Sequence, residues 1–337
     1  MRRMVTCSIF FCLLSSAHGS IEWQNGPMLP TARDRLGSGV VGNLFIIAGG
    51  AYWKNAEKRY YSDTIAYSSK TGKWVRLAYL PKAGAYGASA VMHDNRGNEQ
   101  LLIAGGSNES GAYANCFRLV KERGKFQWKQ LPPLPKPLTG ASAAVIGNKF
   151  YVFGGASNMD EEGIRTACPT LLELRFDNHM VPENRWREII LPNAPSPRIG
   201  AAVASCGKQL FVFGGYGVQA DGMLGNFNDA YVLDFSKPGT RLWKRIANLP
   251  IPVRWASAIA LDSNNIGIFG GYGEYFLDKS FIYNIEKDTY RIDSPIPKAT
   301  AIMASGVSRD GIIFLAGGED EPKHRSASLF LGRWKPD

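Results

Sequence analysis

The densest group of ionisable side chains in this 337-residue sequence follows the last of its six Gly-Gly pairs. Glu319 comes directly after Gly317-Gly318, and Arg325 stands six positions further on, with His324 beside it. A carboxylate held close to a guanidinium could accept or donate a proton, while the arginine binds an anion or keeps the carboxylate ionised. The alternative is a solvated loop with surface ion pairs, and composition alone favours that interpretation.

Four further side chains are candidates for binding an acidic ligand. Arg33, Tyr86, Arg198 and Arg254 each stand just before a short stretch of small, alternating residues. An arginine in such a place could hold the carboxylate of a ligand through paired hydrogen bonds. It could equally bridge neighbouring sheets through backbone carbonyl groups, and the sequence leaves both roles open for the three arginines.

Two sequence markers recur in phase and define the elements that must position these residues. Each Gly-Gly pair ends an apolar run such as residues 44–48, which is typical of a strand buried on both faces. An aromatic residue is followed, five or six positions later, by Leu-Pro or Ile-Pro, and the proline marks the point where an outer strand leaves its sheet. The markers are Gly49-Gly50, Gly105-Gly106, Gly154-Gly155, Gly214-Gly215, Gly270-Gly271 and Gly317-Gly318, with Trp23, Trp74, Trp128, Trp186, Trp243 and Tyr290.

Each repeat of about 50 residues is predicted to be a four-stranded antiparallel sheet, with the Gly-Gly pair closing the second strand. The pattern resembles the kelch motif, which implies an all-β fold, a six-bladed kelch-type β-propeller. The last repeat stops at Trp334 without an outer strand, whereas the outer strand at Trp23 has no repeat before it. We therefore expect the N-terminal strand to complete the last blade. The candidate residues then share one mouth of the central channel.

The start of the chain has the pattern of a secretory signal peptide. A basic pair, Arg2-Arg3, precedes an apolar stretch at residues 4–14 and small residues at 17–19. We predict a signal peptide at residues 1–19, a single propeller domain at residues 20–337, and a periplasmic or secreted protein. The apolar stretch is too short for a membrane anchor, so no membrane insertion is expected after the signal is removed.

Charge and the remaining side chains argue against several classes of function. The formal net charge of +10 suits an anionic ligand or surface. Lysine and arginine are dispersed without a basic stripe interleaved with aromatic residues, so no nucleic acid partner is expected. His93 and His179 are isolated from other metal ligands, and we expect no metal and no cofactor. Asp63, Asp229 and Asp278 are expected to accept hydrogen bonds from turn amides.

Several stretches resemble the sialic acid mutarotases, a family of secreted six-bladed kelch propellers. They are Pro197-Arg198-Ile199-Gly200 with residues 210–215 and Phe227-Asn228-Asp229; residues 45–50 with Tyr61-Ser62-Asp63 and Gly72-Lys73-Trp74; and Ala85-Tyr86-Gly87 before residues 101–103. The blade with Arg198 lies early in the commonest members and later here. The order therefore resembles the cyclically permuted branch of that family, which a ring of blades tolerates because each blade contacts its neighbours.

The resemblance implies an isomerase of the N-acetylneuraminate epimerase or mutarotase type. It would interconvert the anomers of N-acetylneuraminic (sialic) acid, a small acidic sugar, by acid–base ring opening. The implied catalytic pair is Glu319 and Arg325. The implied substrate-binding residues are Arg198, Arg33, Tyr86, Arg254 and His324. Gly84 departs from the family pattern, which often has an arginine there.

Two other classes of function are considered. One is a non-catalytic propeller that binds a glycan or a protein. Sialic acid that bound without faster anomer exchange would favour it over the mutarotase. The other is a copper oxidase of the kelch type, which needs paired His and Tyr ligands that the isolated histidines do not supply. The sequence does not determine the oligomeric state.

Overall fold

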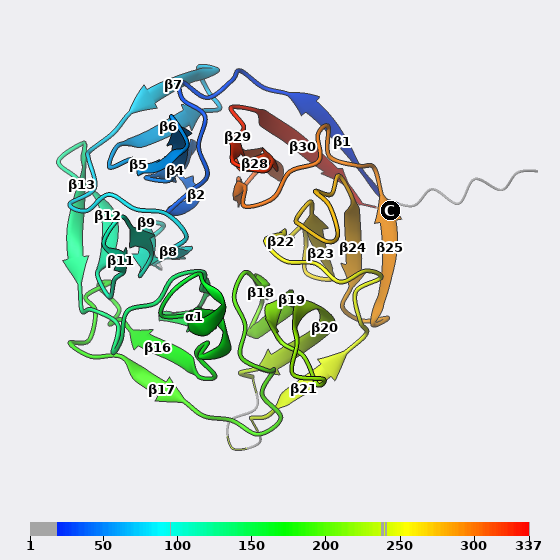
Figure 1. Ribbon diagram of the computed structural model, residues 1–337. Helices are drawn as coiled ribbons and strands as arrows, with labels where there is room; N and C mark the ends of the chain where they lie inside the picture. Colours follow the sequence, from blue (N-terminus) through cyan, green and yellow to red (C-terminus); the bar gives the residue numbers. More distant parts are fainter. Residues whose placement is uncertain (1–18, 95, 237–238, 240, 337) are drawn as a thin grey trace, which may run out of the picture.

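A computed structural model describes residues 19–94, 96–236, 239 and 241–336, which form six four-stranded antiparallel sheets around a central channel (Figure 1). The fold is an all-β, six-bladed propeller, so the prediction from the repeats is confirmed. Apart from Gly19, the predicted signal peptide lies outside the described residues. No helix in the described part of the chain has the length and apolar character needed to cross a membrane.

The blades are numbered in chain order and given from inner to outer strand. Blade 1 consists of β2 (Gly37–Val41), β3 (Leu44–Ala48), β6 (Thr64–Ser68) and β7 (Lys73–Arg76), and blade 2 of β8 (Ala88–His93), β9 (Glu99–Ala104), β12 (Cys116–Glu122) and β13 (Lys125–Leu131). Blade 3 consists of β14 (Ser142–Ile146), β15 (Lys149–Phe153), β16 (Leu171–Arg175) and β17 (Arg187–Ile189), and blade 4 of β18 (Ala202–Cys206), β19 (Gln209–Val218), β20 (Leu224–Asp234) and β21 (Trp243–Ile246). Blade 5 consists of β22 (Ser257–Ala260), β23 (Asn265–Phe269), β24 (Ser280–Asn284) and β25 (Thr289–Asp293), and blade 6 of β26 (Ala304–Val307), β27 (Ile312–Ala316), β30 (Leu329–Lys335) and β1 (Ser20–Asn25).

The continuous apolar runs are buried on both faces because each blade is packed between two others. In β3, Phe45 packs against Phe314 of blade 6. Its neighbour Ile46 points to the opposite face of the sheet and joins Leu101 and Ile103 of blade 2 in another cluster. The same strand therefore contributes to two hydrophobic cores.

The Gly-Gly pairs fasten each blade to the loop that leads into the next one. Gly317 and Gly318 both have positive φ, a backbone region that other residues rarely adopt. The amide of Gly318 donates to the carbonyl of Arg33 at 2.8 Å, and a Cβ on Gly317 would stand 2.3 Å from the same oxygen. The second glycine of each other pair makes the equivalent bond, to the carbonyl groups of Gly84, Leu138, Arg198, Val253 and Thr300.

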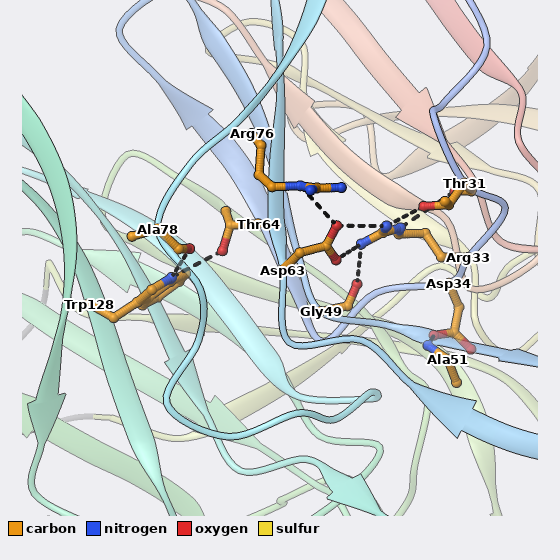
Figure 2. Close-up of polar contacts among 10 residues, drawn as sticks. All are labelled: Thr31, Arg33, Asp34, Gly49, Ala51, Asp63, Thr64, Arg76, Ala78 and Trp128. Carbon is orange, nitrogen blue, oxygen red and sulfur yellow. Dashed lines mark hydrogen bonds and ion pairs between the residues drawn. The ribbon is translucent and has the colours of Figure 1, made fainter.

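The outer-strand aromatic residues make a second contact between blades. Trp128 donates its indole N–H to the carbonyl of Ala78, 3.2 Å away in the loop that leaves blade 1 (Figure 2). Equivalent side-chain bonds run from Trp23, Trp74, Trp186 and Tyr290 to the carbonyl groups of Ser294, Pro27, Pro132 and Ala247. Blade 4 differs, because there the backbone amide of Trp243, and not its indole, donates a hydrogen bond to the carbonyl group of Pro192.

The N-terminal strand closes the ring, as predicted. β1 pairs antiparallel with β30, from Ser20 opposite Lys335 to Asn25 opposite Phe330, and the two strands lie side by side in Figure 1. Ile21 of β1 is 1% exposed and packs in the core between blades 5 and 6. The last blade therefore takes its outer strand from the opposite end of the described chain.

Connections between second and third strands form a raised rim on one side of the ring, which we call the diglycine face. The rim contains β4 (Ala51–Lys54) and β5 (Glu57–Tyr60), β10 (Ser107–Asn108) and β11 (Gly111–Ala112), the short helix α1 (Glu161–Arg165), the far ends of β19 and β20, and β28 (Glu319–Glu321) with β29 (His324–Arg325). Cys116, Cys168 and Cys206 are free thiols.

Candidate functional site

Six equivalent positions at the starts of the inner strands surround the channel on the diglycine face. Backbone hydrogen bonds of 2.7–3.0 Å join them, because each amide after the first donates to the carbonyl of the preceding member. The last five members have positive φ, which turns the chain from the loop into the strand. The six residues are Arg35, Tyr86, Gly140, Gly200, Trp255 and Ile302.

Large side chains at three of these positions cover the end of the channel, and we call them the cap. The indole of Trp255 lies over the two glycines of the ring, since a Cβ on Gly200 would stand 2.8 Å from it and one on Gly140 would stand 3.2 Å from it. The ring of Tyr86 lies 6.0 Å from that of Trp255, and Ile302 packs in the same cluster. A partner approaching this face therefore meets the cap and the rim.

Arg325 is the centre of a buried ion-pair network at the mouth. Its Nε donates to Asp34 Oδ2 at 2.9 Å and its Nη2 donates to the hydroxyl of Tyr86 at 3.0 Å. Its Nη1 lies 3.0 Å from Glu319 Oε1. Burial disfavours the charge, but Asp34, Tyr86 and Glu319 together raise the pKa of Arg325 above its usual value. The predicted pair, Glu319 and Arg325, thus lies in contact. Nε and Nη2 of Arg325 donate hydrogen bonds to protein groups, whereas the buried Nη1 has only its ion-pair contact with Glu319.

Tyr86 is held by two cations. Its hydroxyl oxygen accepts hydrogen bonds from Arg325 and from Lys58 Nζ, which is 3.0 Å away on β5. Burial raises the pKa of Tyr86 well above 10, so it remains a neutral phenol. Burial also lowers the pKa of Lys58. Tyr86 is 6% exposed, and its polar atom serves to join blade 2 to blades 1 and 6.

Arg33 lies in a closed pocket inside blade 1. Its Nη1 is 2.6 Å from Asp63 Oδ1 and 3.3 Å from the carbonyl oxygen of Gly49 (Figure 2). Its guanidinium carbon lies 4.0 Å from the centre of the Tyr61 ring. Arg33 is 1% exposed. Its side chain therefore ties the loop before β2 to the start of β6.

Blade 4 repeats this arrangement with Arg198, which is 0% exposed. Its Nη2 donates to Asp229 Oδ2 at 3.1 Å and its Nη1 donates to the carbonyl oxygen of Gly214 at 3.0 Å. Its guanidinium carbon lies 3.9 Å from the centre of the Phe227 ring. Neither arginine presents a free nitrogen to a ligand, so the structure assigns both to the fold. It also corrects the expectation for Asp63 and Asp229, which pair with these arginines and not with turn amides.

Arg254 differs from the other arginines at the mouth. Its guanidinium lies between two aromatic rings, 4.3 Å from the centre of Tyr216 and 4.8 Å from that of Tyr272. Its Nη1 donates to Asn226 Oδ1 at 2.9 Å. No carboxylate of the described residues is within ion-pair distance of it, and burial lowers its pKa from the usual value. Arg254 is thus a partly buried cation at the mouth that an anion would stabilise.

The six repeats and the shared mouth agree with a comparison against known families. A family model described as the KLHDC2/KLHL20/DRC7 Kelch-repeats domain matches residues 97–318, which is most of the chain. The chain belongs to the kelch-repeat family. The kelch resemblance is therefore confirmed, although the match does not extend to the mutarotase branch.

Similar kelch proteins are found among well-described animal proteins. Host cell factor 2 from Homo sapiens is 30% identical over 73% of the chain, and Beta-scruin from Limulus polyphemus is 25% identical over 72% of it. Kelch-like protein 40 from Xenopus laevis is 25% identical over 59% of the chain. The matched regions span only 31%, 25% and 29% of these three relatives.

These comparisons contradict the prediction of an isomerase. The family model and the three relatives are kelch proteins, and none of them is named as a mutarotase or any other isomerase. They also lend no support to a small acidic sugar as partner. Glu319 and Arg325 are better described as members of the network that joins kelch blades 6, 1 and 2.

His324 points away from this network. It is exposed, and its Nδ1 lies 2.5 Å from Oδ1 of Asp320. The other carboxylate oxygen of Asp320, Oδ2, lies 2.7 Å from Lys298 Nζ. Over the described ranges, no three His, Cys, Asp or Glu side chains are arranged to hold a metal ion. His324 thus belongs to a surface ion-pair group on the rim.

Two residues that dominate the mouth are not among the candidates predicted from the sequence. Asp34 is the main partner of Arg325, and Asn226 holds Arg254. A signal for Asp34 was present, because it precedes its inner strand by the same interval as Arg254 does in blade 5. Aligning the six kelch loops at this point places both charged residues in the same layer of the mouth.

Proposed function

We propose that this kelch propeller is a non-catalytic binding module whose diglycine face recognises an acidic segment of a protein partner. The observation that carries the proposal is Arg254, a partly buried cation stacked between two tyrosines without a carboxylate of its own among the described residues. An Asp or Glu side chain of a partner would supply the missing charge. Charge-assisted hydrogen bonds of this kind are among the stronger contacts at interfaces.

The surroundings of Arg254 have the composition of an interface hot spot. Tyr275, 64% exposed, lies on the loop between β23 and β24 that also carries Tyr272. Met223, 65% exposed, lies further out on the rim, at the tip of the β19–β20 hairpin that carries Tyr216 and contacts α1. Tyrosine, methionine and arginine are enriched where proteins meet, because they bury much area with few polar groups to desolvate. Apolar contact around a single charged anchor supports a polypeptide partner over a small sugar.

Elsewhere at the mouth, two cations stand against two carboxylates. Asp34 and Glu319 both lie against Arg325 at 2.9 and 3.0 Å, and the charge of Lys58 interacts favourably with both carboxylates. The formal net charge of the chain is +10, so long-range attraction also favours an acidic partner. The proposal therefore places the contact on the side of the mouth formed by blades 4 and 5.

Selection of a phage-displayed random peptide library on the immobilised full chain tests this proposal. We expect the enriched peptides to contain Asp or Glu, and Arg254→Gln to weaken their binding by at least ~10-fold, the effect of losing a charged hydrogen bond. Arg245→Gln, on the outer strand β21, is the matched control and should bind like the wild type. Enriched peptides without acidic residues, or unchanged binding by Arg254→Gln, would refute the proposal.

A titration of the same protein with N-acetylneuraminic acid separates a protein partner from a glycan. Under the proposal, calorimetry shows no heat of binding for the free sugar at concentrations where acidic peptides bind. Saturable binding of the sugar that depends on Arg254 would favour the glycan alternative. Either result leaves the fold assignment unchanged.

We also propose that the protein is exported, as residues 1–19 suggest. The closing strand β1 begins at Ser20, the first residue after the proposed cleavage point. Cleavage there would leave the strand intact for pairing with β30. Mass spectrometry of the protein from a cell extract and from the external fraction tests the proposal, since a chain that retains residues 1–19 in both would contradict it.

A further inference from the structure

A cavity of about 390 Å³ occupies the central channel. Its wall consists mainly of Ala, Ser, Gly and Val residues of the inner strands. The charged and ionisable residues on the wall lie at two levels, with Arg35 at the capped end and His93, Glu99 and Arg309 at the far end. The volume is enough for about ten water molecules, or for a small hydrated anion.

The charges at the far end compensate one another. Glu99 Oε1 accepts from Arg309 Nε at 3.0 Å and lies 3.2 Å from His93 Nδ1. Its other carboxylate oxygen accepts the backbone amide of Gly42. These contacts tie together the turns of blades 1, 2 and 6 and leave little net charge at that level.

Arg35 has no such compensation. Its Nε donates to the carbonyl of Met303 at 3.0 Å and its Nη1 to the carbonyl of Gly87 at 3.2 Å, so the side chain crosses from blade 6 to blade 2 in front of β2. Within the described residues, Nη2 has no acceptor and the guanidinium has no ion-pair partner. Burial lowers the pKa of Arg35, and the nearby Asp34, which is bound to Arg325, offsets this only in part.

We propose that the capped end of the channel binds a small anion, an inorganic oxyanion or a short carboxylate, on the guanidinium of Arg35. The two occupied nitrogens fix the direction of the guanidinium, and the third is left for an oxygen of the anion. Because Trp255, Tyr86 and Ile302 cover the end of the channel on the diglycine face, the anion enters from the opposite end of the channel, past Arg309. This site is separate from Arg254 and does not depend on the proposed peptide-binding function.

Thermal unfolding in increasing sulfate, with ionic strength held constant by sodium chloride, tests the site. We expect a saturable rise in the Tm of the wild type, because a ligand that binds the folded state stabilises it. Arg35→Gln should weaken the apparent sulfate affinity by at least ~10-fold. Arg309→Gln, at the other level of the same channel, should respond like the wild type.

A second variant separates loss of the anion from loss of the bridge between blades 6 and 2. Arg35→Lys keeps a positive charge but loses the planar fork whose Nε and Nη1 reach the two carbonyl groups, so we expect a lower Tm without sulfate and a retained response to it. A wild type with no saturable response would overturn the proposal. So would a folded Arg35→Gln that responds like the wild type, or a response that Arg254→Gln abolishes instead.

Discussion

Arg325 and Asp34 stand 291 positions apart in the chain, yet Arg325 Nε donates to Asp34 Oδ2 at 2.9 Å with both side chains almost fully buried. The pair joins blade 6 to blade 1, the two blades that meet where the ring closes. The pairing of β1 with β30 lies within blade 6 itself. Blade 6 is therefore closed by strand pairing at its outer edge and joined to blade 1 by the ion pair at the mouth.

Removing Asp34 should destabilise the fold strongly. Asp34→Ala leaves Arg325 buried beside Glu319 alone, and breaking a buried pair in this way costs about 3–5 kcal/mol. Replacing both residues, as Asp34→Ala with Arg325→Met, should cost less than the sum of the single changes. Urea unfolding measures each free energy. As a control, Glu161→Ala removes the exposed partner of Arg165 on α1 and should change stability by only about 0.5 kcal/mol.

The Gly-Gly pairs should be intolerant of a side chain in a way that other glycines are not. Gly105 and Gly147 both have positive φ, but a Cβ on Gly105 would stand 2.4 Å from the carbonyl oxygen of Leu138, whereas one on Gly147 would meet nothing within 4 Å. Gly147→Ala should cost about 1–2 kcal/mol for its backbone conformation alone. Gly105→Ala should cost a further ~1–3 kcal/mol because the blades must shift apart. Equal losses for both variants in urea unfolding would contradict this account.

The closing strand should contribute to stability through its buried side chain. Ile21 of β1 is 1% exposed, whereas Ile292 of the outer strand β25 is 71% exposed. Ile21→Ala should cost about 2–5 kcal/mol, the range for isoleucine in a packed core. Ile292→Ala, the matched control, should change stability by no more than about 0.5 kcal/mol. If the two variants unfolded at the same denaturant concentration, β1 would not be part of the cooperative fold.

Stability should fall with acidification partly through Glu173, a 1% exposed residue of β16. Burial works to raise its pKa, but hydrogen bonds from Arg175 and Tyr151 and the charge of Lys149 bring it below the usual 4.5. A carboxyl group whose pKa is lowered on folding stabilises the fold above its unfolded-state pKa and loses that contribution as the pH falls through the folded-state value. Glu173→Gln should therefore be less stable than the wild type near neutral pH.

The measurement for Glu173 is the free energy of unfolding from about pH 7 to about pH 3 in both proteins. The difference between them should shrink as the pH falls below 4.5, because the wild-type carboxylate becomes neutral. Glu122→Gln, which removes the exposed partner of Lys129 in blade 2, is the control for losing an ion pair that does not contact Glu173. A constant difference between Glu173→Gln and the wild type would show that packing, not charge, explains the loss.

The fold could be predicted because its two markers act locally and repeat. A Gly-Gly pair such as Gly317-Gly318 ends a strand and contacts the adjacent loop, and an aromatic residue such as Trp128 reaches the preceding loop. Each needs only its own blade and one neighbour. Counting the markers was therefore enough to predict six blades and the closure by the N-terminal strand.

The candidate site was predicted less well, because the repeat places residues in a layer without saying what they pair with. Arg33, Arg198 and Arg254 have the same residue type and similar positions before an inner strand. In the structure the first two are closed by Asp63 and Asp229, while Arg254 has only Asn226 and two aromatic rings. Arg33 and Arg198 stand four residues before β2 and β18, whereas Arg254 stands three residues before β22. This offset of one residue is visible only once the strand bounds are known.

By itself, the sequence determined the number of blades, their strand order, the way in which the ring closes and the face of the ring on which the candidate residues lie. The tertiary structure decided which of those residues are engaged with one another and which keep a free polar group. The reason is that a buried charge needs a partner in space, and that partner can come from any blade. Asp34 and Arg325, near opposite ends of the described chain, illustrate a pairing that only the closed ring creates.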